Sequence, residues 1–133
     1  MDTLARILKP LVGQPIALPD DLLARFPELR AARFRRGGLP VRVGGWFIGR
    51  STAAGITLWR TVFLAKDLPP SVELLLHEVR HVHQFEASAA FPIRYLLESL
   101  RRGYHHNRFE ADARAYAAER LRGVGSELRR REG

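Results

Sequence analysis

Apolar and polar positions alternate in short runs between residues 31 and 64, and glycines separate these runs from one another. The runs are ARFRR (32–36), VRV (41–43), WFI (46–48) and ITLWRTVFLA (56–65). Short β-prone runs bounded by glycine are typical of strands joined by tight turns. This region therefore predicts a small, mostly antiparallel sheet.

Segments with helical spacing and helix boundary signals lie before and after the predicted sheet. The predicted helices are 19–30, which Asp20 can cap and Pro27 limits; 71–86, opened by Ser71; 92–103, closed by Gly103; and 107–121, closed by Gly123. The order of helix, sheet and further helices predicts an α+β fold. We expect residues 1–133 to form a single domain, with about 1–18 and 123–133 peripheral or frayed.

Composition and charge narrow the class of protein. The chain has 133 residues, of which 46% are hydrophobic and 27% charged, as in soluble globular domains. Lys9 and Pro10 interrupt the apolar residues of the N-terminus, and no apolar stretch reaches the roughly 18 residues of a membrane span. We therefore expect a cytoplasmic protein with neither a signal peptide nor a transmembrane segment. The net charge of +8 favours acidic partners without choosing among them.

The chain has no cysteine, so a metal site must be built from histidine and carboxylate side chains. His77, Glu78, Val79, Arg80 and His81 form the motif HExxH inside a predicted helix. Residues four apart project from the same side of a helix, so the imidazoles of His77 and His81 can converge on one tetrahedral zinc ion. HExxH in a helix therefore predicts a zinc site.

Glu78 lies about 100 degrees around the helix axis from His77. This offset keeps its carboxylate out of the ligand set but within reach of a metal-bound water, whose proton it could accept. The competing interpretation is that both histidines and Glu78 are solvated residues on an exposed helix face. Apolar residues surround the motif on most sides, which favours burial and the metal site.

Glu110 is the strongest candidate for a third ligand, in the setting GYHHNRFEADA. A structural alternative is a capping box, in which Glu110 would bond the backbone at Asn107. His105 and His106 are rival ligands or donors to an oxyanion, and Tyr104 and Tyr116 are weaker candidates for that donor.

Other polar residues near the motif have different expected roles. His83 lies about 240 degrees from His77, so it faces elsewhere on the helix. Gln84 and Asp112 are candidates to orient the imidazoles through hydrogen bonds, as zinc-binding histidines require.

The segments LLLHEVRHVHQFE and NRFEADA resemble the gluzincin metallopeptidases, in which HExxH and a glutamate on a later helix bind zinc. More closely, the chain is similar to short bacterial HExxH domains of unknown function and to the single-domain minigluzincins, over roughly residues 37 to 120. The resemblance implies a zincin-like fold, a small twisted sheet packed on the HExxH helix, and an edge strand within residues 46–64 that binds substrate. Arg114 departs from this pattern, because larger gluzincins carry an acidic residue there.

The sequence therefore predicts a zinc-dependent peptidase with one zinc ion on His77, His81 and Glu110, Glu78 as general base, and a peptide or protein substrate. One alternative is a zinc-binding interaction module without catalysis. Another is a nucleic-acid-binding domain, suggested by arginine clusters at 30–36, 101–102 and 129–131 but supported by no binding motif.

Overall fold

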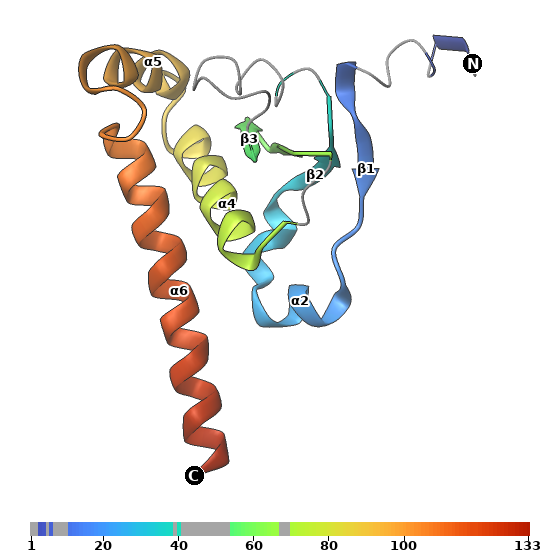
Figure 1. The fold of residues 1–133 in the computed structure, drawn as a ribbon, viewed down its shortest axis with the longest axis vertical. Coiled ribbons are helices and arrows are strands. Elements are labelled where there is room, and N and C mark those ends of the chain that lie inside the picture. Colours follow the sequence, from blue (N-terminus) through green and yellow to red (C-terminus); the bar gives the residue numbers. More distant parts are fainter. Residues whose placement is uncertain (1–2, 5, 7–10, 39, 41–53, 67–69) are drawn as a thin grey trace.

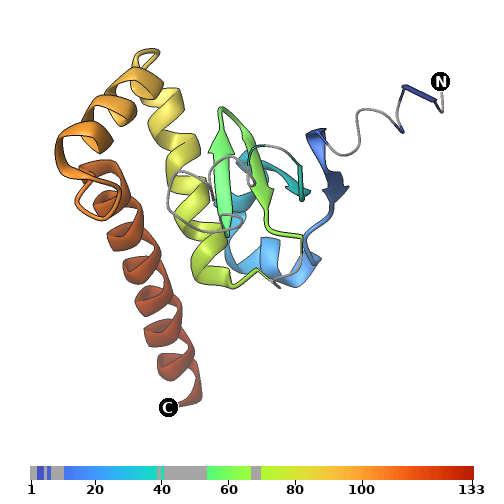
Figure 2. The same cartoon turned by 45° about the horizontal axis from the view of Figure 1, so that its top comes forward.

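A long central helix lies between a small sheet and a second long helix (Figures 1 and 2). The structure is a computed structural model that describes residues 3, 4, 6, 11–38, 40, 54–66 and 70–133. Its elements, in chain order, are β1 (Gln14–Ile16), α2 (Asp20–Arg25), the 3-10 helix η1 (Pro27–Ala31), β2 (Arg33–Arg36), β3 (Gly55–Leu58), β4 (Thr61–Leu64), α4 (Val72–Ala87), α5 (Phe91–Arg102) and α6 (Arg108–Glu132). This arrangement confirms the α+β class.

The described strands form one mixed sheet in the order β1-β2-β4-β3. β1 pairs with β2 and β3 pairs with β4 in antiparallel fashion, but β2 and β4 are parallel. A two-residue turn at Trp59 and Arg60 joins β3 to β4, which makes this pair antiparallel. Two of the three described pairings are thus antiparallel, in line with the expected mostly antiparallel sheet, and the third is parallel. The predicted strands 41–43 and 46–48 lie outside the described residues.

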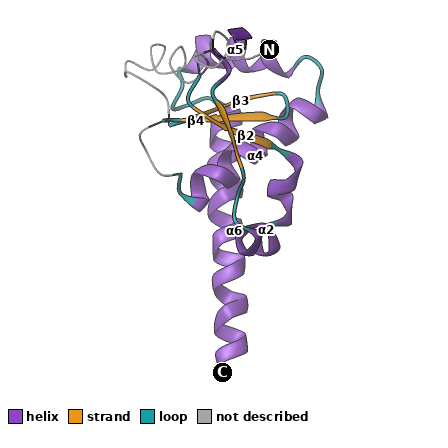
Figure 3. Ribbon diagram, turned by 90° about the vertical axis from the view of Figure 1, so that its right-hand side faces the viewer, coloured by secondary structure: helices purple, strands orange, loops and turns teal. Residues whose placement is uncertain are grey.

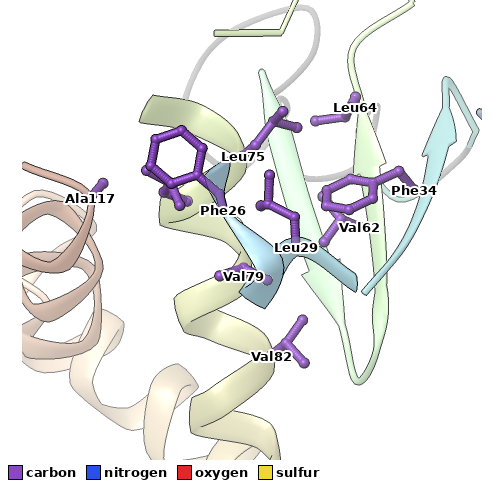
Figure 4. Packing of buried hydrophobic residues seen from close by; sticks show 10 residues of the cluster. Phe26, Leu29, Phe34, Val62, Leu64, Leu75, Val79, Val82 and Ala117 are labelled. Atoms are coloured by element: carbon purple, nitrogen blue, oxygen red, sulfur yellow. The ribbon is translucent and has the colours of Figure 1, made fainter. Parts of the chain in front are cut away.

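The strands lie beside α4 (Figure 3), and the hydrophobic core fills the space between them (Figure 4). It comprises Phe26, Leu29, Phe34, Val62, Leu64, Leu75, Leu76, Val79, Val82 and Ala117. On α4, Leu75, Val79 and Val82 follow helical spacing, so one face of the helix is fixed against the sheet. Each fully buried aliphatic side chain contributes about 1.5–3 kcal/mol through apolar burial. Among the described helices, the HExxH helix α4 therefore has the most buried residues.

Two of the expected helix boundaries are confirmed. Ser71 caps α4 by accepting a hydrogen bond from the Leu74 amide at 3.1 Å. Gly103 ends α5 with φ 77, a backbone conformation that favours glycine.

The other boundary predictions were partly wrong. Asp20 does not cap α2, because Pro19 takes the N-cap position and its carbonyl accepts from the Leu23 amide. The segment divides at Phe26 into α2 and η1. The first strand, β1, lies within residues expected to be peripheral.

Helix α6 continues past Gly123 to Glu132, so the expected end at Gly123 was wrong. Leu121 and Val124 pack against the core on either side of this glycine, and good helix formers follow from Glu127 onward. The C-terminal part of α6 extends away from the sheet (Figure 1). Among the described residues, no helix combines the length and apolar character needed to cross a membrane.

Candidate metal centre

The two histidines of HExxH lie one turn apart on α4 with their Nε2 atoms 3.2 Å from each other. Neighbouring Val79 and Val82 are fully buried in the core, which fixes the rotation of the helix. His81 is almost completely buried, whereas His77 is partly exposed. The helix therefore presents two imidazole nitrogens at one point, as its spacing predicted.

Glu110, in the first turn of α6, reaches the same point from the neighbouring helix. Its Oε2 atom lies 2.8 Å from Nε2 of His77, and its Oε1 atom lies 3.2 Å from Nε2 of His81. Asn107 caps α6 by accepting from the Phe109 amide at 2.8 Å, and the Glu110 carboxylate turns inward. The capping-box alternative is therefore wrong, because this carboxylate contacts imidazoles rather than the start of its own helix.

Tyr95 on α5 completes the surroundings of Glu110 and was not anticipated from the sequence. Its hydroxyl donates to Oε1 of Glu110 at 2.6 Å. Helical spacing from the buried Phe91 and Glu98 places Tyr95 on the inward face of α5, which is the only signal the sequence offers. Each helix from α4 to α6 thus contributes to the cluster.

Gln84 orients His81 from one turn further along α4. The Gln84 amide nitrogen donates to the Phe109 carbonyl at 3.0 Å and to Asp112 Oδ2 at 2.9 Å. Its oxygen therefore faces Nδ1 of His81 at 2.7 Å, and that ring nitrogen must carry a proton. Arg80 in turn holds Asp112 by two hydrogen bonds. A continuous chain of hydrogen bonds therefore runs from Asp112 through Gln84 to the imidazole of His81, as the expected orienting role of Gln84 and Asp112 requires.

Glu78 is buried beside this cluster, and a residue of the sheet holds its carboxylate in place. The Thr57 hydroxyl on β3 donates to its Oε2 atom at 2.7 Å. Gly55 leaves room for this carboxylate, since a Cβ atom at Gly55 would lie 3.2 Å from both Cγ and Oε1 of Glu78. The neighbouring strand therefore holds Glu78 through its Oε2 atom.

The electrostatics of the cluster require a positive charge at its centre. Because Nδ1 of His81 is protonated, a neutral His81 would turn the Nε2 lone pair toward the Glu110 carboxylate, which is repulsive. Burial lowers the pKa of His81, but the hydrogen bond to Glu110 and the charges of Glu78 and Glu110 outweigh it and raise the pKa to about 9. Burial raises the pKa of Glu110, yet hydrogen bonds from His77 and His81 hold it well below its usual range. A proton or a metal cation meets this requirement.

The donor atoms of the cluster could hold a metal ion, and their spacing is close to that of a tetrahedral zinc site. Zinc–nitrogen bonds of about 2.0–2.1 Å in tetrahedral geometry place neighbouring ligand atoms roughly 3.3 Å apart. The two Nε2 atoms are separated by 3.2 Å, and one Glu110 oxygen lies 3.2 Å from His81. His77, Glu78 and His81 also offer ligand atoms within 4.8 Å of one another. Glu110 suits the third ligand better, because both of its oxygens face imidazoles whereas Thr57 engages Glu78.

The remaining candidates from the sequence make other contacts. His105 and His106 are exposed in the turn before α6. The Tyr116 hydroxyl donates to Glu28 at 3.3 Å, and His83 packs edge-on against the Tyr116 ring. Tyr104 contacts the ring of His105. Arg114 bonds the His105 carbonyl instead of approaching an imidazole of the motif.

Comparison with family models, curated proteins and solved structures finds no match to this chain. The fold and the cluster define an α+β protein in which two imidazoles and a carboxylate from adjacent helices converge on one point. The resemblance to gluzincins thus rests on the motif and its setting alone, and the zincin-like fold stays a prediction.

Proposed function

We propose that this protein is a zinc-dependent peptidase of the gluzincin type, with His77, His81 and Glu110 as the metal ligands. One observation carries the proposal: the Glu110 carboxylate lies 2.8 Å and 3.2 Å from the Nε2 atoms of His77 and His81, 33 and 29 residues away along the chain. All three groups favour zinc, and nothing in the local sequence brings the Glu110 carboxylate of α6 to the two imidazoles of α4. A bound zinc ion would polarise the scissile carbonyl and activate a water for attack on it.

Glu78 is the proton acceptor in this proposal. The Thr57 hydroxyl occupies Oε2, which leaves Oε1 to accept a proton from the attacking water and to deliver it to the leaving amine. Burial of Glu78 in the α4–β3 contact limits its motion, so the carboxylate is positioned before substrate arrives. Glu78 is therefore the catalytic residue, and Thr57 is a positioning residue.

Strand β3 is the proposed contact for the peptide substrate. It is the outermost of the described strands on the side of β4, and both Thr57 and Gly55 on this strand touch Glu78. An extended peptide that adds to such an edge pairs through main-chain hydrogen bonds, which tolerate many side chains. A peptide on β3 would thus run past the general base. Residues 46–53 of the expected edge segment lie outside the described residues.

Metal content and peptide cleavage test the proposal together. Wild-type protein should hold about one zinc per chain, and His77→Ala, His81→Ala and Glu110→Ala should each lose it. His83→Ala is the matched control, because it removes an imidazole from the same helix on a different face. Circular dichroism checks that each variant is folded. Failure of folded wild-type protein to bind added zinc would refute the metal site.

Cleavage of a peptide library by zinc-loaded protein then tests the reaction. Glu78→Gln preserves the shape of the side chain and its hydrogen bond from Thr57, but removes the base, so cleavage should fall by about 10²–10⁴-fold with zinc retained. Equal cleavage by this variant would reject Glu78 as the base. Zinc binding without cleavage by wild-type protein would identify a zinc-binding interaction module instead.

A further inference from the structure

Helix α5 turns four large apolar side chains toward solvent. Ile93, Leu96, Leu97 and Leu100 are 65%, 57%, 52% and 75% exposed. They occupy positions i, i+3, i+4 and i+7, so they form a single stripe, which we call the leucine face of α5. Helices of soluble domains normally bury such a stripe, and a contiguous exposed one marks an interaction surface.

The opposite face of α5 is already used by the fold. Phe91 and Glu98 are buried there, and Tyr95 donates its hydroxyl to Glu110. Turning α5 to bury the leucine face would withdraw Tyr95 from the cluster. Figures 1 and 3 both place α5 across the end of the molecule opposite the C-terminus. The leucine face is therefore a surface for something outside the described fold.

Positive charge borders the leucine face on one side. Arg94 and Arg101 are the i−3 and i+4 neighbours of Leu97, and both are exposed. Within the described part of the chain neither guanidinium forms an ion pair, whereas the nearby Arg102 is paired with Glu98 at 3.1 Å. Apolar side chains flanked by unpaired arginines are typical of helices that lie in a membrane interface.

We propose that the leucine face of α5 docks the protein on a membrane surface that contains anionic lipids. The four apolar side chains enter the boundary between headgroups and acyl chains, while Arg94 and Arg101 contact lipid phosphates. Charge favours this occupant over a second copy of the chain. Face-to-face pairing of two α5 helices would bring four unpaired arginines together between chains that each carry a net charge of +8.

Docking in this orientation also sets the distance between the metal cluster and the membrane. Tyr95 and Glu110 lie on the inward side of α5, so the cluster stands about one helix diameter, roughly 10–12 Å, from the lipid. The docking proposal itself rests only on the surface of α5 and holds whether or not the protein is a peptidase.

Vesicle flotation of the purified full chain tests the docking. The protein should float with vesicles of phosphatidylcholine mixed with phosphatidylglycerol, and bind those of phosphatidylcholine alone at least about tenfold more weakly. Leu96→Ser with Leu100→Ser should weaken binding to the mixed vesicles by about tenfold or more, since both side chains would otherwise be buried in lipid. Leu128→Ser, which alters an exposed leucine of α6, should not weaken it.

Arg94→Gln with Arg101→Gln should reduce the preference for anionic vesicles by about tenfold or more. Arg129→Gln with Arg130→Gln, at the far end of α6, is the matched control. The proposal is overturned if wild-type protein does not bind the mixed vesicles, or if the leucine variant binds them equally well. A dimer in size-exclusion chromatography that Leu96→Ser with Leu100→Ser dissociates, without vesicle binding, would assign the face to a second copy.

Discussion

The side-chain oxygen of Gln84 accepts the Nδ1 proton of His81 at 2.7 Å, and this contact decides which nitrogen of His81 faces Glu110. The amide nitrogen of Gln84 is tied to Asp112 and to the Phe109 carbonyl, so the amide cannot flip without losing both bonds. Residues on α4 and α6 thus fix the orientation of one proposed ligand. Arg114, four residues after Glu110, bonds the His105 carbonyl instead.

Gln84→Ala should therefore weaken zinc binding by about 10–100-fold, the usual cost of removing a partner that orients a metal-bound histidine. The imidazole of His81 would lose its fixed tautomer and rotamer while remaining on the helix. Competition with a chromophoric chelator measures the affinity.

His83→Ala provides the control for Gln84→Ala, because it removes a neighbouring polar side chain that packs against Tyr116. Zinc affinity in this control should equal that of wild type. Wild-type affinity in Gln84→Ala would show that the hydrogen-bonded path does not support the metal site.

Gly55→Ala should impair peptide cleavage without reducing zinc content. The added Cβ atom would lie 3.2 Å from Cγ and Oε1 of Glu78, closer than ordinary van der Waals contact, and would displace the carboxylate. Small displacements of a catalytic group cost roughly tenfold to a hundredfold in rate. Steady-state cleavage and metal analysis on the same preparation separate the two effects.

Gly125→Ala is suited as the control for the Gly55 substitution. A Cβ atom at Gly125 would meet only the guanidinium end of Arg129, at 3.9 Å or beyond. Cleavage by this variant should match wild type. Full activity in Gly55→Ala would argue that Glu78 does not need its observed position.

The convergence of the HExxH histidines was predictable because it depends only on helical spacing within α4. Ser71, Val79 and Val82 supply a cap and a buried stripe that specify this helix locally. The contact of Glu110 with both imidazoles needed the additional expectation that a later helix returns to α4. The structure brings these three side chains together as the sequence predicted.

Tyr95 and Thr57 could not be assigned to the cluster from sequence. Each reaches it through tertiary packing, Tyr95 from α5 and Thr57 from β3, and neither stands at a spacing that marks a site. The parallel pairing of β2 with β4 could not be predicted from the sequence either, because strand order depends on how the chain returns to the sheet. Three-residue β1 is too short for alternation to identify it.

Glu28 links η1 to α6 and should make stability depend on pH. Burial raises the pKa of Glu28, but hydrogen bonds from Arg120 and its positive charge outweigh burial and lower the pKa below the ordinary 4.5. A lowered pKa in the folded state contributes stability above about pH 4.5 and loses it as the pH falls below that value. Glu28→Gln should therefore cost about 1 kcal/mol of unfolding free energy at neutral pH.

Urea unfolding of wild type and Glu28→Gln at a series of pH values measures this linkage. The difference between the two proteins should shrink as the pH falls through and below 4.5, because the wild-type carboxylate becomes protonated. Glu127→Gln, on an exposed position of α6, should change stability little at any pH. A constant difference across the series would show that the ion pair with Arg120 is not its source.

Substitution of Gly123 and Gly103 tests whether each glycine lies inside a helix or ends one. A Cβ atom at either position would meet nothing within 4 Å, so space does not distinguish them. Gly123 lies inside α6 at an ordinary helical φ, and Gly123→Ala should stabilise the protein by about 0.5–1 kcal/mol. Gly103 has φ 77 after α5, and Gly103→Ala should destabilise the protein by about 1–2 kcal/mol.

Urea unfolding of both variants measures the two changes in unfolding free energy. Changes of opposite sign would establish that α6 is continuous at Gly123. Destabilisation by both substitutions would instead indicate that the chain leaves the helix at Gly123.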